Sequence, residues 1–109
     1  MSTSKPVGGP PIDREHLERA TLGDPALQRE VLTMFQTQLA EARARLAGAD
    51  ASERSRIAHA IKGAAMGLGA FEIADCAARI ERRPGEVRFV EEFALLASRL
   101  DEAIRPLTA

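Results

Sequence analysis

Residues 50–69 read DASERSRIAHAIKGAAMGLG, and this stretch decides the fold. Asp50 and Glu53 have the spacing of a capping box, in which the Asp side chain accepts a hydrogen bond from an amide three residues on and the Glu reaches back. Apolar side chains then recur at helical spacing, at Ile57, Ile61, Ala64, Ala65 and Leu68. The glycines at positions 67 and 69 weaken the helix toward a tight reversal. We therefore predict a helix that is followed by a sharp turn.

Capping and breaking residues predict four more helices. Asp24-Pro25 is a clear start signal, because Asp caps the free amides while Pro at the first helical position has no amide to lose. At the other end of the chain, Pro106 is placed to stop the last helix. The expected helices cover residues 13–22, 25–48, 70–82 and 86–105.

The expected helices are amphipathic, and no segment alternates as a strand would. In the long helix over 25–48 the expected core positions are Leu27, Val31, Met34, Phe35, Leu39, Ala42 and Leu46. Four amphipathic helices with short connections pack as a bundle. We predict an all-α fold, an antiparallel up-down four-helix bundle with a short extra N-terminal helix as a lid. Residues 1–12 are expected to form a flexible tail and residues 13–109 the bundle domain.

Length and composition exclude several classes of protein. A chain of 109 residues has room for one small core. Its net charge of -1 and its lack of Trp and Tyr argue against nucleic-acid binding, which needs positive surface and stacking platforms. A lone Cys76, the absence of a signal segment and the lack of an apolar run of about 20 residues favour a cytoplasmic protein that does not enter membranes.

His59 lies on the outer face of the helix over residues 50–69. With a turn of about 100° per residue and Ile57 at zero, the apolar stripe centres near about 20° and His59 near about 200°. The imidazole is therefore expected to face water. Its neighbours on this face, three or four residues apart along the helix, are Ser52, Ser55, Arg56, Lys62, Gly63 and Met66.

Three of these neighbours suggest a site, although an exposed histidine is most often ordinary surface. Gly63 costs about 1 kcal/mol relative to Ala inside a helix, and its missing side chain lets another protein approach the imidazole. Met66 is an adaptable apolar group that suits docking. Lys62 is near enough to offset negative charge on a phosphorylated ring. Gly67 and Gly69 are instead expected to let two helices pack closely.

The stretch over residues 59–70 resembles the signature of the histidine-phosphotransfer (HPt) family. That signature is His, any residue, apolar, Lys, Gly, two small residues and, after a short gap, an apolar residue and Gly; every position is filled here. The resemblance implies that His59 is the phosphoacceptor, Lys62 stabilises the phosphoryl charge and Gly63 leaves room for the partner. Many members have Gln where this chain has Glu81, so an acidic residue there either orients the ring or repels the phosphoryl group.

The resemblance also implies the partners. The donor is an aspartyl phosphate on a receiver domain, and the expected partners are response-regulator receiver domains and a hybrid histidine kinase. Ser55, Arg56, Gly63, Met66 and Glu81 are the expected docking residues. No carboxylate cluster surrounds His59, so we expect no cofactor on this chain and Mg²⁺ on the partner. Without a nucleotide-binding loop the chain is not expected to be an enzyme that uses ATP.

Three alternatives remain open from the sequence. A helical adaptor would bind a receiver or kinase without carrying phosphate. The dimerisation portion of a sensor kinase would be an obligate dimer, whereas a chain with four helices of its own is expected to be a monomer. A metal site built from His16, His59 and Cys76 is disfavoured, because the three residues lie on separate expected helices without ligand spacing.

Overall fold

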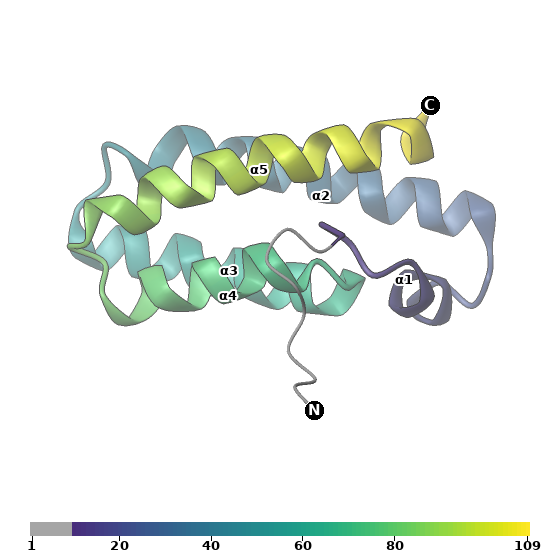
Figure 1. The fold of residues 1–109 in the computed structure, drawn as a ribbon, viewed down its shortest axis with the longest axis horizontal. Coiled ribbons are helices and arrows are strands. Elements are labelled where there is room, and N and C mark those ends of the chain that lie inside the picture. The colour runs from purple at the N-terminus through teal and green to yellow at the C-terminus, as the bar shows by residue number, and fades with distance from the viewer. Residues whose placement is uncertain (1–9) are drawn as a thin grey trace.

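The computed structural model describes residues 10–109, which form five helices and contain no strand (Figure 1). The helices are α1 (Arg14–Ala20), α2 (Pro25–Leu46), α3 (Ala51–Leu68), α4 (Phe71–Arg82) and α5 (Val87–Thr108). The predicted all-helical fold is confirmed. None of the helices in this part of the chain is both long and apolar enough to span a membrane. Residues 1–9 of the predicted tail lie outside the described residues, whereas Ile12 at its end is buried in the core.

Three of the predicted helix starts have a common chemistry, whereas α4 and α5 have no side-chain cap. Asp13, Asp24 and Asp50 each accept a hydrogen bond from a backbone amide two or three residues further on, at 3.1, 2.9 and 2.8 Å. These bonds satisfy amides that have no partner within the helix. The return half of the predicted capping box is not present, because the carboxylate of Glu53 pairs with Arg45 at 3.4 Å.

Each of the four longer helices packs against two of the others. Helix α2 packs against α3 and α5, and α4 packs against the same two helices. Figure 1 shows them lying lengthwise beside one another, with the chain turning back at each connection. The largest fully buried side chains include Phe35 on α2 and Phe93 on α5, and Leu17 joins them from α1. Helix α1 packs against α3.

Gly69 makes the turn between α3 and α4 and holds α1 against it. Its φ of 90° lies in the left-handed region, and an added Cβ would meet the carbonyl oxygen of Asp13 at 3.0 Å. The amide of Asp13 in turn donates to the carbonyl of Gly69 at 2.9 Å. The predicted need for glycine is therefore confirmed at position 69. At Gly67 the same prediction is wrong, because an added Cβ there would meet nothing within 4 Å.

The core face of α2 is displaced from the predicted one. Leu32 is fully buried, whereas the expected core residue Met34 is 61% exposed and Leu27 is also exposed. The buried row of α2 is Leu32, Phe35, Leu39, Ala42 and Leu46. Val31 and Met34 each precede a residue of this row and so lie about 100° round the helix. The apolar stripe of α2 is thus wider than its buried face, and the surplus lies at the surface.

The sequence predicted that α5 stops at Pro106. In the structure this helix continues to Thr108. A proline lacks an amide donor and its ring crowds the carbonyl four residues before it, but only Leu107 and Thr108 follow Pro106 in the helix. Leu107 packs against the core, and the Thr108 hydroxyl donates to the carbonyl of Arg105 at 3.1 Å. These contacts hold the last turn in helical form.

At one end of the bundle, Arg54 forms hydrogen bonds both to the end of α2 and to the loop between α4 and α5. Its guanidinium donates to the carbonyls of Leu46 and Ala47, at 2.9 and 3.1 Å, and to the carbonyl of Pro84 at 3.0 Å. The first two carbonyls belong to the end of α2 and the third to the loop between α4 and α5. One side chain of α3 therefore fixes the end of α4, where Glu81 lies.

Candidate functional site

His59 lies near the middle of α3 and faces solvent, as its spacing predicted. Its side chain is 70% exposed, and its Nδ1 atom lies 2.7 Å from Oε2 of Glu81, in the last turn of α4. Residues before and after the Gly69 turn come level when α3 and α4 fold back on each other. This register brings Glu81 to His59, and the carboxylate holds one edge of the ring.

Lys62 binds the other oxygen of the same carboxylate. Its Nζ atom lies 2.7 Å from Oε1 of Glu81, and both side chains are about three-quarters covered. The Lys62 ammonium and then the His59 ring, each through a hydrogen bond, lower the pKa of the Glu81 carboxyl below its ordinary value. Glu81 is therefore ionised at neutral pH and bridges the side chains of His59 and Lys62.

The ionised carboxylate determines the tautomer of a neutral His59 ring. A carboxylate without a proton can only accept hydrogen bonds, so the hydrogen of the neutral imidazole must lie on Nδ1. The lone pair is then on Nε2, the ring nitrogen that Glu81 does not contact. The arrangement presents a nitrogen nucleophile to solvent on the outer face of α3.

The backbone of Glu81 is also held in place. The hydroxyl of Ser55 on α3 donates to the carbonyl oxygen of Glu81 at 3.1 Å. Ser55 is half-buried, so it lies between the two helices and not on their open face. We call Ser55, His59, Lys62 and Glu81 the α3–α4 seam. The predicted neighbour Arg56 is exposed, and its guanidinium donates to the Ser52 hydroxyl at 3.2 Å.

Open space surrounds the site on the side of α2. An added Cβ at Gly63 would meet nothing within 4 Å, so packing within this chain does not require a glycine there. Met66 is 52% exposed. Gly63 also borders a mainly apolar hollow of about 300 Å³ between α2 and α3, here called the α2–α3 hollow. It is lined by Ala20, Thr21, Val31, Met34, Phe35, Gln38, Gly63, Ala64, Gly67 and Leu68.

The sequence assigned Met34 to the core, but in the structure it is exposed and lines the α2–α3 hollow. Phe35 is the residue of this pair that is buried. The signal that separates them is weak, since adjacent apolar residues both fit a helical stripe and only the register against α3 decides between them. Met34 and Met66 thus expose two flexible apolar side chains, on α2 and on α3.

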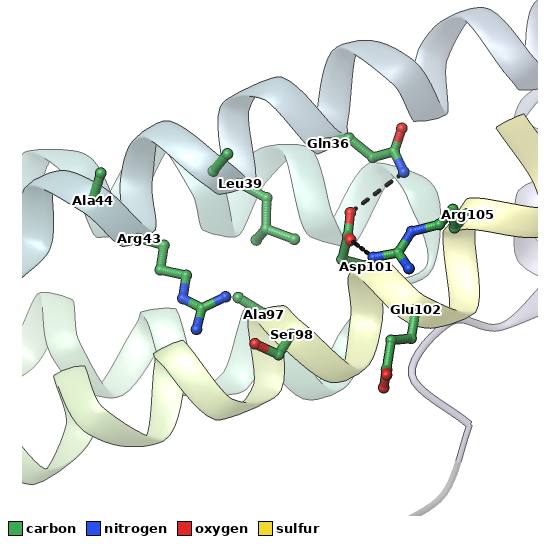
Figure 2. A pocket seen from close by; sticks show the side chains of 10 residues that line it. Gln36, Leu39, Arg43, Ala44, Ala97, Ser98, Asp101, Glu102 and Arg105 are labelled. Carbon is green, nitrogen blue, oxygen red and sulfur yellow. Dashed lines mark hydrogen bonds and ion pairs between the residues drawn. The ribbon is translucent and has the colours of Figure 1, made fainter.

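A further hollow lies elsewhere, between α2 and α5 (Figure 2). We call this hollow of about 690 Å³ the α2–α5 groove. Asp101 lies at its centre, 2.6 Å from the guanidinium of Arg105 and 3.4 Å from the amide nitrogen of Gln36. No histidine or cysteine lines it. Its polar groups offer no nucleophile comparable to His59.

Within residues 10–109, no group of three or more His, Cys, Asp or Glu side chains is placed to hold a metal ion. The three residues of the alternative metal site each have other contacts. His16 Nε2 lies 3.2 Å from the carbonyl oxygen of Gly67. Cys76 is buried, its thiol donates to the carbonyl of Phe89, and burial raises its pKa to about 12. A thiol that keeps its proton is a poor metal ligand.

An all-helical domain that presents a histidine beside a lysine and in front of a carboxylate has the features of a histidine phosphotransfer module. The Hpt domain family matches residues 26–105, from the start of α2 to the last turns of α5, and the chain belongs to this family. The resemblance seen in the sequence is thereby confirmed. Domains of this family carry out histidine phosphotransfer in phosphorelays, interact with receiver domains and have no kinase activity of their own. No match was found among curated proteins or among solved structures.

Proposed function

We propose that the chain is a phosphorelay intermediate that accepts a phosphoryl group on Nε2 of His59 from the aspartyl phosphate of one receiver domain and passes it to another. The observation that carries this proposal is the 2.7 Å contact between Glu81 and Nδ1, because it leaves Nε2 as the free nucleophile. His59 is the phosphoacceptor, and Glu81 is a positioning residue that acts through the ring.

The transfer needs no general base on this chain. The Nε2 lone pair attacks phosphorus, the bond between phosphorus and the aspartyl oxygen breaks, and the aspartate leaves as a carboxylate. The Nδ1 hydrogen stays in its bond to Glu81 throughout, so the ring does not turn away during the reaction. Catalysis of this kind is mainly positioning and charge stabilisation, and His59 receives its position from α4.

Lys62 supplies positive charge to the transferred group. In the resting site this charge is balanced by Glu81 at 2.7 Å. A phosphoryl group on Nε2 brings further negative charge, and the flexible lysine stem lets Nζ move toward it. Sharing one ammonium between Glu81 and the phosphoryl group disfavours an overly stable phosphohistidine, and this suits a carrier that must give the group up again.

The partner binds around His59. Arg56, Gly63, Met66 and Glu81 form the contact surface, and the α2–α3 hollow with Met34 extends it toward α2. Ser55, which the sequence placed on this surface, instead supports it from between α3 and α4 through the carbonyl of Glu81. Gly63 gives the space through which a receiver domain reaches the ring. The receiver holds the Mg²⁺ that phosphoryl transfer requires, so this chain needs no cofactor. A hybrid histidine kinase is the proposed source of phosphate.

The finer architecture belongs to the same proposal. The four long helices form an antiparallel up-down bundle, and α1 is a lid that the Gly69 turn holds against α3. The core is contributed by every helix of one chain, and this supports a monomer. We expect the protein to act in the cytoplasm, where receiver domains are found.

The decisive test is phosphotransfer profiling against radiolabelled receiver domains of the source organism. Wild-type chain is expected to take up acid-labile label, and His59→Gln none. His16→Gln removes the other histidine and is the matched control, expected to keep the label. Label on His59→Gln contradicts the assignment. Receiver binding without any label on the wild type favours the adaptor, and an obligate dimer in sedimentation favours the kinase portion.

A further inference from the structure

The end of α4 and the start of α5 form a pocket rich in arginine. Arg79, Arg82, Arg83 and Phe89 line a hollow of about 420 Å³, here called the arginine pocket. Arg79 and Arg82 lie in the last turn of α4, Arg83 caps that helix, and Phe89 lies in the first turn of α5. None of these residues takes part in the α3–α4 seam.

Charge in this region is only partly balanced. Arg79 pairs with Glu92 at 2.6 Å, and Arg88, which lies over the ring of Phe89, pairs with Glu86 at 3.1 Å. Within residues 10–109, by contrast, the guanidinium groups of Arg82 and Arg83 have no ion pair or side-chain hydrogen bond. Two exposed side chains with five donors each are thus free to bind an anion.

The dipole of α4 does not by itself account for the positive charges of both Arg82 and Arg83. The C-terminal end of a helix carries about half a negative charge, which one cation offsets. Arg79 is already paired with Glu92, so Arg82 in the last turn offsets this charge and Arg83 adds positive charge beyond that need. The chain as a whole has a net charge of -1, so this local excess is a feature of the pocket and not of the composition.

The pocket lies within reach of a partner bound at His59. Arg82 follows Glu81 directly, so the two side chains point about 100° apart around α4. Across a helix about 10 Å wide, the pocket is on the side toward α5 and His59 on the side toward α3. A standard interface of about 800 Å² per partner has a radius of roughly 16 Å. A domain centred on His59 therefore also covers Arg82.

We propose that the arginine pocket recognises carboxylate side chains on the surface of the phosphotransfer partner and so guides that partner onto His59. This inference rests on the proposed phosphorelay function. Guanidinium groups match carboxylates with two parallel hydrogen bonds, and a domain that holds Mg²⁺ for phosphoryl transfer carries exposed acidic residues. Arg79 and Arg88 already lie over the ring of Phe89, with their guanidinium carbons 5.7 and 5.2 Å from its centroid, so a base that stacked on this ring would compete with them.

The test measures association of the full chain with the receiver domain that labels His59 fastest. In stopped-flow experiments, Arg82→Ala/Arg83→Ala is expected to associate about tenfold more slowly at low ionic strength, because electrostatic contacts act mainly on the association rate. The deficit should shrink in about 0.5 M salt, which screens exposed charges. The rate of transfer at saturating receiver should stay at the wild-type value.

The matched control is Arg29→Ala/Arg43→Ala, which removes the same charge from exposed arginines of α2 whose side chains have no ion pair among the described residues. An equal loss of rate in both double variants reduces the effect to net charge and overturns the inference. A loss of rate at saturating receiver also overturns it, because the arginines would then act on the chemistry. Thermal unfolding within about 2 °C of wild type shows that the variants remain folded.

Inorganic phosphate is the second probe. In an NMR titration, phosphate could shift the signals of the Arg82 and Arg83 side chains to saturation at low millimolar concentration. If it does so while all variants associate with the receiver equally, the pocket is a small-anion site and the inference fails. If no receiver labels the wild-type chain, the proposed function itself fails. Normal labelling with wild-type association of the double variant rejects the arginine pocket alone.

Discussion

The α3–α4 seam and the α2–α5 groove both join two helices of one bundle, but they use polar side chains in opposite ways. In the seam, Glu81 reaches across to His59 and Lys62 at 2.7 Å each. In the groove, Asp101 pairs mainly with Arg105 on its own helix, and its bond across to Gln36 is long at 3.4 Å. The hollow of about 690 Å³ therefore lies where the polar contacts between helices are weaker.

Under the proposed function the reactive group lies outside the α2–α5 groove, so cavity size does not identify the site. Short side chains such as Ala40, Ala44 and Ala97 leave the groove open without directing any reactive group into it. The seam instead holds the His59 ring in one orientation through Glu81. Rigid positioning by a second helix is what distinguishes the candidate site.

The largest effect is expected from removing the carboxylate of the seam. Glu81→Ala should slow phosphoryl uptake by about 100-fold, because a misplacement of about 1 Å in the nucleophile has a cost of this order. Glu81→Gln should stay within about tenfold of wild type, since its amide oxygen still accepts from Nδ1. Single-turnover uptake from a phosphorylated receiver, at saturating concentration, measures both.

Asp101→Ala is the control for this comparison, because it removes the carboxylate of the groove. Its uptake rate should equal that of wild type. Equal losses in Glu81→Ala and Asp101→Ala would abolish the distinction between the two regions. A rate for Glu81→Gln as low as that for Glu81→Ala would show that negative charge, and not ring position, is what Glu81 provides.

The second largest effect is expected from removing the guanidinium of Arg54, which binds backbone carbonyls at the end of the bundle near Glu81. Arg54→Ala removes three hydrogen bonds between a charged donor and backbone carbonyls, so we expect a loss of about 2 kcal/mol in unfolding free energy. This corresponds to a fall in Tm of roughly 10 °C for a domain of this size. Calorimetry checks it. Arg43→Ala, at the groove, should change stability by less than about 0.5 kcal/mol.

Local signals in the sequence were enough to predict much of the fold. Asp24 and Asp50 are caps whose chemistry involves residues two or three apart, and the outward direction of His59 follows from the pitch of one helix. Such features need no knowledge of other helices. The family signature over residues 59–70 is equally local, and the family assignment that it suggested is confirmed.

What the sequence left open depends on contacts between helices. Whether Glu81 orients or repels could not be decided, because the answer lies in the rotamers of side chains 22 residues apart. Met34 was placed in the core because only packing against α3 separates it from Phe35. Pro106 was expected to end α5, but the helix continues to Thr108 with Leu107 packed, partly buried, against the core.

A third effect separates stability from function at Gly63. Gly63→Ala should raise stability by up to about 1 kcal/mol, because Ala is the better helix former and the Cβ meets no neighbour. The Tm should rise by about 5 °C. Receiver binding should nevertheless weaken several-fold, since the new methyl group lies about 6 Å along the helix from His59. Thermal unfolding and receiver affinity are measured on the same sample.

Gly67→Ala is the matched variant for Gly63→Ala. Its Cβ also meets nothing within 4 Å, so the gain in Tm should be similar. It lies about 12 Å along the helix from His59, so receiver affinity should change less. A loss of affinity that is equal in both variants would move the contact surface away from His59. A fall in Tm for Gly63→Ala would show that the glycine serves the fold.

A smaller effect is expected from acid. The pKa of Glu81 is lowered in the folded chain by Lys62 and then by His59, so its contribution to stability is present above the unfolded value near 4.5 and is lost as pH falls through the lower folded value. The difference in Tm between wild type and Glu81→Gln should therefore shrink from pH 5 to pH 3. A difference that stays constant over this range would mean that the carboxylate is not held by its two partners.

The smallest effect is expected on the other side of the bundle, in the α2–α5 groove. Ala44→Leu fills part of this hollow from an exposed position of α2, and Leu forms helices nearly as well as Ala, so stability should change by less than about 0.5 kcal/mol. Phosphoryl uptake and receiver affinity should equal those of wild type, because the groove contains no group that reaches His59. A variant that folds normally but binds the receiver less tightly would show that the partner also covers the groove, and the two regions would then have to be treated as parts of one interface.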